Sequence, residues 1–130
     1  MAKRLSKALR EKRRWIGLLV EHSVAQRSEV EAMLEHVRSR TNPTARIRLM
    51  DFVPEAQRSA STVQSDLATS HPGGGLAIVR VDLKDARGFR EALGDEDAMA
   101  NLGLMSLTTS GKIRLVRERL GLPPPPRANR

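Results

Sequence analysis

Four apolar stretches stand out along this chain, separated by segments of helical spacing or of polar composition. A continuous apolar run opens residues 15–23 (WIGLLVEHS), and apolar and polar residues alternate in residues 45–53 and 75–83. A fourth stretch, LGLMSLTT, covers residues 102–109. Runs of this length and period predict β-strands, and the first reads as a buried central strand.

The alternation in the second and third predicted strands also assigns their faces. In the second, Ala45, Ile47 and Leu49 share one face, while Arg46 and Arg48 share the other. In the third, one face carries Leu76, Ile78, Arg80 and Asp82, and the other carries Ala77, Val79, Val81 and Leu83. Each strand therefore presents one apolar face and one face with charged residues near its end.

Three segments between and after the strands have the pattern of helices. Ser28 with Glu31 predicts a capping box for a helix that carries Val30, Met33, Leu34 and Val37 and ends at Asn42-Pro43. Asp85 is the predicted cap of a second helix, which ends at Gly94. Residues 111–121 form a third, with Ile113, Val116 and Leu120 as its core stripe. Residues 55–72 are small and polar and predict a long mobile loop with room for a helical turn, and the acidic residues 94–101 predict a connector or a further short turn.

The order of elements is therefore β-α-β-β-α-β-α, which predicts an α+β fold. The expected architecture is an RRM-like, ferredoxin-like βαββαβ sandwich: a four-stranded antiparallel sheet with two helices on one face. We expect a basic N-terminal arm at residues 1–13, the sandwich domain at 14–121 with an extra C-terminal helix, and a polyproline and basic tail at 122–130.

Charge is concentrated at the two ends of the chain. The net charge of the 130 residues is +8; residues 1–14 hold seven Lys or Arg and one acid, and residues 111–130 hold six and one. The middle is slightly acidic. Cationic ends predict a polyanionic partner, with nucleic acid favoured over an anionic membrane surface. The absence of cysteine and of any long apolar segment fits a cytoplasmic protein that crosses no membrane.

The sequence gives little support to catalysis or to a bound metal. His22, His36 and His71 fall on a strand end, a helix and a turn without metal-ligand spacing. The TSGK stretch lacks the first glycine and the final hydroxyl of a phosphate loop, and HPGGG precedes a strand rather than joining a strand to a helix. We therefore expect no catalytic residue, no metal site and no cofactor on the protein itself.

The two phenylalanines and one tryptophan do not form an aromatic recognition motif, so base stacking is not predicted. The cationic residues favour contacts to the backbone of structured RNA. Ser110, Gly111 and Lys112 stand where the last strand meets the last helix. Two compatible interpretations remain open there: Ser110 caps the helix, or the corner binds a phosphate with the charge of Lys112.

Three segments carry a resemblance to a known family: LREKRRWIGLLVE, GGGLAIVRVDLKDARGFREAL and LGLMSLTTSGKIRLVRERLG. Together they resemble protein component two of archaeal ribonuclease P, the Pop-five family of ribonuclease P and MRP subunits, over most of residues 9–121. The family's Ser-Gly corner corresponds to Ser110 and Gly111, and its strand arginine to Arg80. Lys112 stands where the family often has threonine.

The resemblance implies a non-catalytic subunit that supports ribonuclease P RNA in removing the 5′ leader of precursor tRNA, with magnesium on the RNA. It also implies a barrel-shaped protein partner, in a dimer of heterodimers. The residues expected to bind RNA are Arg10, Lys12, Arg13, Arg14, Arg80, Ser110, Gly111, Lys112, Arg114 and Arg117, and Leu115 is expected to contact the protein partner. The alternatives are an RNA-binding protein of another particle, such as the ribosome, or a small ferredoxin-like ligand-binding regulatory domain.

Overall fold

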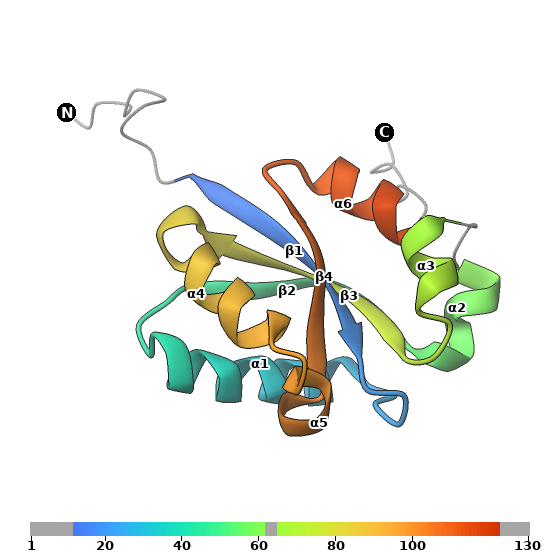
Figure 1. Ribbon diagram of the computed structural model, residues 1–130, viewed down its shortest axis with the longest axis horizontal. Helices are drawn as coiled ribbons and strands as arrows, with labels where there is room; N and C mark the ends of the chain where they lie inside the picture. The colour runs from blue at the N-terminus through green and yellow to red at the C-terminus, as the bar shows by residue number, and fades with distance from the viewer. Residues whose placement is uncertain (1–11, 62–64, 123–130) are drawn as a thin grey trace, which may run out of the picture.

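The computed structural model describes residues 12–61 and 65–122 (Figure 1). These residues form the strands β1 (Arg13–Val20), β2 (Ile47–Val53), β3 (Gly75–Asp82) and β4 (Leu104–Ser110). They also form the helices α1 (Arg27–Thr41), α2 (Glu55–Ser61), α3 (Asp66–Ser70), α4 (Leu83–Gly94), α5 (Ala98–Leu102) and α6 (Ile113–Leu120). The predicted basic arm, apart from its last two residues, and the predicted tail after Leu122 lie outside the described residues.

The four strands make one sheet in the order β2-β3-β1-β4, with every neighbouring pair antiparallel. The apolar run that predicted a buried central strand is β1, which pairs with β3 on one side and β4 on the other. This order, with α1 joining β1 to β2 and α4 beginning the connection from β3 to β4, is consistent with ferredoxin-like topology. The predicted four-stranded antiparallel α+β fold is confirmed.

The first hydrophobic core lies between the sheet and helices α1 and α4. Ile16, Leu18 and Val20 project from β1 into it, and Phe89 and Leu93 of α4 are almost completely buried there. The same core receives the Ala77, Val79 and Val81 face of β3. The predicted alternation is therefore confirmed in β3, because the residues between these three belong to the opposite face of the sheet.

Helix α6 lies on the opposite side of the sheet from α1 and α4 (Figure 1), and a second core lies between α6 and the sheet. Val116 and Leu120 of α6 are fully buried there, which confirms the predicted core stripe of the last helix. Gly17 of β1 makes this close approach possible. A Cβ atom at Gly17 would lie 3.0 Å from Leu120 Cδ1 and 2.9 Å from Thr108 Cγ2, a tighter spacing than side chains tolerate.

Two arginines hold α6 to the strands on either side. The Arg117 guanidinium lies 2.9 Å from the Asp51 carboxylate of β2, and only 14% of the Arg117 side chain is exposed. Arg119 donates hydrogen bonds to the Thr108 hydroxyl at 3.0 Å and to the Thr109 carbonyl at 3.1 Å, both on β4. Helix α6 is thus attached to both edge strands as well as packed on the centre of the sheet.

Residues 55–72, predicted to be a long loop with room for a helical turn, contain the two short helices α2 and α3, so more of the segment is helical than expected. Glu55 accepts a hydrogen bond from the Gly74 amide at 2.7 Å, and Arg58 donates to the carbonyls of His71 and Gly74 at 2.7 and 2.9 Å. Arg58 is buried, and desolvation lowers the pKa of its guanidinium from the ordinary value. These contacts tie the two ends of the segment together.

The predicted capping residues of both helices were wrong, because each helix begins earlier in the chain than expected. Helix α1 begins at Arg27, and it is Glu29, rather than Glu31, whose carboxylate accepts a hydrogen bond from the Gln26 amide at 3.1 Å. Helix α4 begins at Leu83, directly after β3, so Asp85 lies inside its first turn. The buried Asp85 instead accepts a hydrogen bond of 2.7 Å from the side chain of Asn42, which joins α4 to the end of α1.

A candidate nucleic-acid interface at the open end of the sheet

Helix α6 leaves one end of its sheet face uncovered, and the strand register places four residues there in a single row. Arg48 of β2 is paired with Arg80 of β3, and Arg80 is paired with Trp15 of β1. Trp15 is in turn paired with Ser110 of β4. Because side chains alternate between faces along each strand, paired residues share a face. The row therefore runs across all four strands beside α6.

A second row lies next to the first, towards the end of the sheet. Arg13 of β1 is paired with Asp82 of β3, and the Arg46 guanidinium approaches the Asp82 carboxylate to 3.1 Å. Asp82 is buried, whereas 69% of the Arg46 side chain is exposed. The ion pair therefore places a positively charged group at the surface beside the first row.

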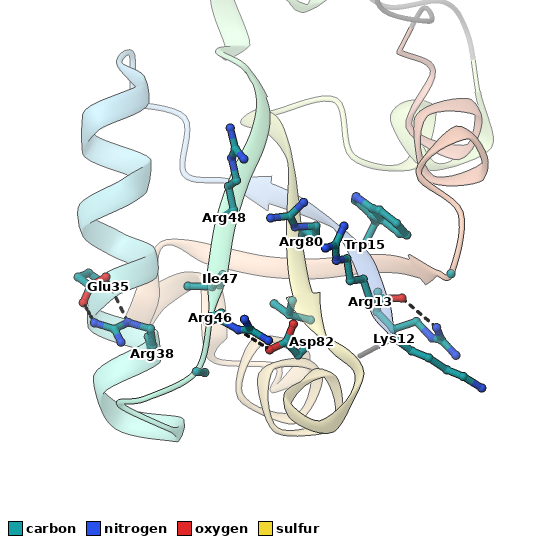
Figure 2. A pocket seen from close by; sticks show the side chains of 14 residues that line it. Lys12, Arg13, Trp15, Glu35, Arg38, Arg46, Ile47, Arg48, Arg80 and Asp82 are labelled. Carbon is teal, nitrogen blue, oxygen red and sulfur yellow. Dashed lines mark hydrogen bonds and ion pairs between the residues drawn. The ribbon is translucent and has the colours of Figure 1, made fainter. Parts of the chain in front are cut away.

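Except for Ser110, the residues of the two rows line the floor of a hollow of about 1080 Å³. Its lining contains seven basic and only two acidic residues, and we call it the cationic hollow. Its lining residues are Lys12, Arg13, Arg14, Trp15, Glu35, Arg38, Ala45, Arg46, Ile47, Arg48, Arg80, Val81, Asp82 and Gly111. In Figure 2, Arg13 and Arg80 lie beside Trp15, and Arg48 projects from the neighbouring strand.

The two acidic residues of the hollow are already paired. Besides the Arg46–Asp82 pair, Glu35 of α1 forms an ion pair with Arg38, whose Nε donates to the carboxylate at 3.2 Å. This hydrogen bond lowers the pKa of the Glu35 carboxyl and raises the pKa of Arg38 from their ordinary values. Both members therefore keep their charges around neutral pH.

The remaining arginines of the floor lack such partners. Within residues 12–61 and 65–122, the side chains of Arg13, Arg48 and Arg80 form no hydrogen bond or ion pair. Arg48 and Arg80 are moreover directly opposite each other on adjacent strands, where like charges destabilise a sheet. A bound anion would relieve this repulsion, so the hollow has the charge arrangement of an anion-binding surface.

The structure brings together five of the residues that the sequence predicted to bind RNA. Lys12, Arg13, Arg14, Arg80 and Gly111 all line the cationic hollow. A Cβ atom at Gly111 would lie 3.2 Å from the Arg14 guanidinium, so the glycine leaves room for Arg14 beside the corner between β4 and α6. Arg10 lies outside the described residues.

The corner itself differs from the prediction that Ser110 caps the last helix. Ser110 is the last residue of β4, and its hydroxyl accepts a hydrogen bond of 3.1 Å from the Lys112 amide. Lys112 is the N-cap of α6, which begins at Ile113. Ser110 therefore stabilises the turn that precedes the helix, and the Lys112 side chain remains exposed at its start.

The three predicted residues within α6 lie away from the lining of the hollow. Arg114 is exposed and lies 3.5 Å from Glu118 one turn later, whereas the largely buried Arg117 pairs with Asp51. Leu115 is half-buried and lies outside the second core. Arg114 remains available to a ligand, while the position of Arg117 favours a structural role.

Sequence reasoning missed Trp15, Arg38, Arg46 and Arg48 as site residues. Alternation had already placed Arg46 and Arg48 on one face of their strand, as it had placed Arg80 on one face of the next. If these two strands had been assumed to be neighbours with their charged faces on the same side of the sheet, Arg46 and Arg48 would have been expected near Arg80. Trp15 and Arg38 gave no comparable signal, because their positions in the hollow depend on the register of β1 and the packing of α1.

Other kinds of site find less support in the described part of the chain. There, no group of three or more His, Cys, Asp or Glu side chains is arranged to hold a metal ion. None of the helices in residues 12–61 and 65–122 is long and apolar enough to span a membrane. A scan against models of known protein families and a search of curated proteins found no match to this chain.

Proposed function

We propose that this chain is a non-catalytic RNA-binding subunit of a ribonucleoprotein. The observation that carries the proposal is the cationic hollow, in which Arg13, Arg48 and Arg80 have no acidic partner among the described residues. RNA offers closely spaced phosphates, and several unpaired guanidinium groups on one rigid sheet can contact successive phosphates. As part of this proposal we describe the fold as RRM-like, and α6 is then the extra C-terminal helix on the proposed RNA-binding face of the sheet.

The particle that we propose is ribonuclease P, in which the protein would support the catalytic RNA during removal of the 5′ leader of precursor tRNA. The support for this choice is the resemblance of the three sequence segments to the Pop-five family. In this proposal magnesium belongs to the RNA, and a barrel-shaped protein subunit is the partner, in a dimer of heterodimers. Leu115, half-buried on α6, remains the proposed contact for that partner.

The position of the hollow favours this proposal over a ligand-binding regulatory domain. For a regulatory domain we would expect the ligand pocket near the glycine-rich turn at residues 71–75, which leads into the start of β3 at Gly75. The cationic hollow lies at the other end of β3, around Arg80 and Asp82. Its open, strongly basic lining suits a polyanion better than a small apolar metabolite.

The test is reconstituted cleavage of precursor tRNA at limiting magnesium, with the catalytic RNA and the partner subunit present. Omitting this protein should lower the cleavage rate, and a protein with Arg48→Ala and Arg80→Ala should restore less of it than wild type. Arg87→Ala is the matched control, because Arg87 is exposed on α4 and already paired with Glu91 at 3.0 Å. An unchanged rate on omission would refute the ribonuclease P assignment.

Sequencing the RNA that copurifies with the tagged protein separates this particle from its main rival. Ribonuclease P RNA is the expected product. Ribosomal RNA in its place would support the ribosomal alternative, with the RNA-binding role retained. Weakening of RNA affinity with added salt is expected in both cases, since phosphate contacts release counterions. Binding that is insensitive to salt would favour the regulatory domain.

A further inference from the structure

Trp15 occupies the central strand of the sheet, in the middle of the arginine row. It lies between Arg80 on β3 and Ser110 on β4, and it lines the cationic hollow. On its other side it packs against the second core, beside the residues under α6. The tryptophan therefore stands at the boundary between the apolar part of this sheet face and the charged part.

The exposed part of the Trp15 side chain is entirely hydrocarbon. The residue as a whole is half-buried, but its single polar side-chain atom, Nε1, is inaccessible to solvent. Nε1 has no hydrogen-bond partner in the part of the chain that the structure describes. The indole is thus oriented with its polar atom inwards, and the side-chain surface that Trp15 adds to the hollow is hydrocarbon. Hydrocarbon beside several guanidinium groups gives the hollow a surface for an apolar group as well as for phosphate.

The neighbours of Trp15 are arranged along a line that a nucleic-acid strand could follow. Arg80 lies on the strand next to Trp15, and Arg48 lies on the strand beyond it. Each step from one strand to the next is about 4.8 Å. Neither arginine is paired within the described residues. An aromatic ring followed by two free guanidinium groups matches the order of base and backbone phosphates along an extended strand.

We propose that Trp15 stacks an unpaired base of RNA while Arg80 and Arg48 bind the adjoining phosphates. This inference rests on the proposed RNA-binding function and adds that the RNA in the hollow is single-stranded. Bases in a duplex are stacked on one another and cannot reach the floor of a sheet, whereas a splayed base can lie on an aromatic ring. The arginines alone would accept either form, so Trp15 is the residue that discriminates between them.

The chain provides its own reporter for this contact, because Trp15 is its only tryptophan and it contains no tyrosine. The experiment titrates the whole protein with a short unpaired RNA oligonucleotide and, separately, with a blunt duplex containing the same strand. Tryptophan fluorescence should be quenched by the single strand as the base stacks. The duplex should bind through charge, weaken with added salt, and leave the fluorescence nearly unchanged.

Substitutions at Trp15 measure the contribution of stacking to affinity, read from a labelled RNA. Trp15→Leu should weaken single-strand binding by about 5- to 150-fold, the range expected for one stacked base, and leave duplex binding unchanged. Trp15→Phe should recover part of the loss, because phenylalanine retains an aromatic face. Circular dichroism and thermal unfolding establish that each variant is folded.

Substitution of the arginines separates phosphate binding from stacking. Arg80→Ala with Arg48→Ala should weaken binding of both RNAs, and saturating single strand should still quench Trp15. Arg87→Ala on α4, outside the cationic hollow, should behave as wild type in every assay. These variants retain the reporter tryptophan, so the test remains decisive even if Trp15→Leu fails to fold.

The outcomes distinguish the stacking inference from the function on which it rests. If the single strand binds without quenching, or if folded Trp15→Leu binds it as tightly as wild type, stacking is refuted and the RNA-binding proposal stands. Failure of both RNAs to bind the wild-type protein would refute both proposals. Equal quenching by duplex and single strand would also overturn the inference, because paired bases are not free to stack.

Discussion

The face of the sheet that carries α6 has two halves of opposite chemistry. In the covered half, Gly17 of β1 and Ile78 of β3 lie under Val116 and Leu120 of α6. In the cationic half, two residues along the same strands, Trp15 replaces glycine and Arg80 replaces isoleucine. A single pleated surface thus changes from an apolar surface packed under α6 to a charged surface, which is the proposed RNA-binding surface, within two residues of each strand.

The comparison shows how a small sheet can be stabilised on one half of a face while the other half stays open and charged. Burial of the covered half fixes the sheet and the strand register, and the register then holds the arginines and Trp15 in a rigid row. The cationic half contributes repulsion rather than stability, since Arg48 faces Arg80. Substitutions should therefore affect folding in the covered half and RNA binding in the cationic half.

The largest expected effect is in the covered half, at Leu120. Leu120→Ala should lower the free energy of unfolding by about 2–5 kcal/mol, because it leaves a cavity between α6 and β1. Urea denaturation measures the loss. Leu115→Ala is the matched control: the same change on the same helix, at a half-buried position outside the second core, should cost clearly less. Equal losses would show that α6 does not pack through its Leu120 face.

Gly17→Val should reduce stability by about 1–3 kcal/mol through overpacking, since even a Cβ atom there lies within 3.1 Å of Val116. Gly88 provides the contrast, because a Cβ atom at this helical position meets nothing within 4 Å. Gly88→Ala should raise stability by about 0.4–1 kcal/mol by restricting the unfolded chain. Thermal unfolding of both variants tests the pair, and a neutral Gly17→Val would contradict the close approach of α6.

Two arginines on α6 should separate stability from binding. Arg117→Ala should cost about 1–3 kcal/mol, because it removes a largely buried guanidinium and leaves Asp51 without this partner. Arg114→Ala, at an exposed position, should change stability by less than about 0.5 kcal/mol. Denaturation curves for both variants give the comparison. If Arg117→Ala leaves the stability unchanged but weakens RNA binding, Arg117 is a binding residue rather than a structural one.

In the cationic half, Arg48→Gln should stabilise the free protein slightly, by about 0.2–0.5 kcal/mol at low salt, because it removes the repulsion of Arg80. The gain should fade as salt screens the charges. Arg46→Gln serves as the control: it removes the partner of the buried Asp82 carboxylate and should give no such gain. Thermal unfolding over a salt series provides the measurement, and a destabilised Arg48→Gln protein would argue against an unrelieved repulsion.

The smallest expected effect is at the corner between β4 and α6. Lys112→Ala should weaken RNA binding modestly and reduce the salt slope of log affinity by about one unit, as for one lost phosphate contact. Lys84→Ala removes another exposed lysine, from the first turn of α4, and should alter neither quantity. If Lys112→Ala also alters neither, the corner is a structural turn alone.

Some elements of the fold could be predicted from the sequence and others could not. The strands and the faces of β2 and β3 were predictable because a period of two is a local property. The segment at residues 55–70 was not, because α2 and α3 are too short to show helical periodicity. Their arrangement depends on contacts such as Arg58 to the carbonyls of His71 and Gly74, which lie 13 and 16 residues away.

The candidate site divides in the same way. Sequence alone determined that the chain is basic, that Arg80 and Arg48 project from charged strand faces, and that a Ser-Gly-Lys corner precedes the last helix. Tertiary structure decided which of these residues meet. Strand register placed Trp15 and Arg48 beside Arg80, and the burial of α6 removed Arg117 from the lining of the hollow. The physical reason is that pairing and packing join residues far apart in the chain, which local periodicity cannot specify.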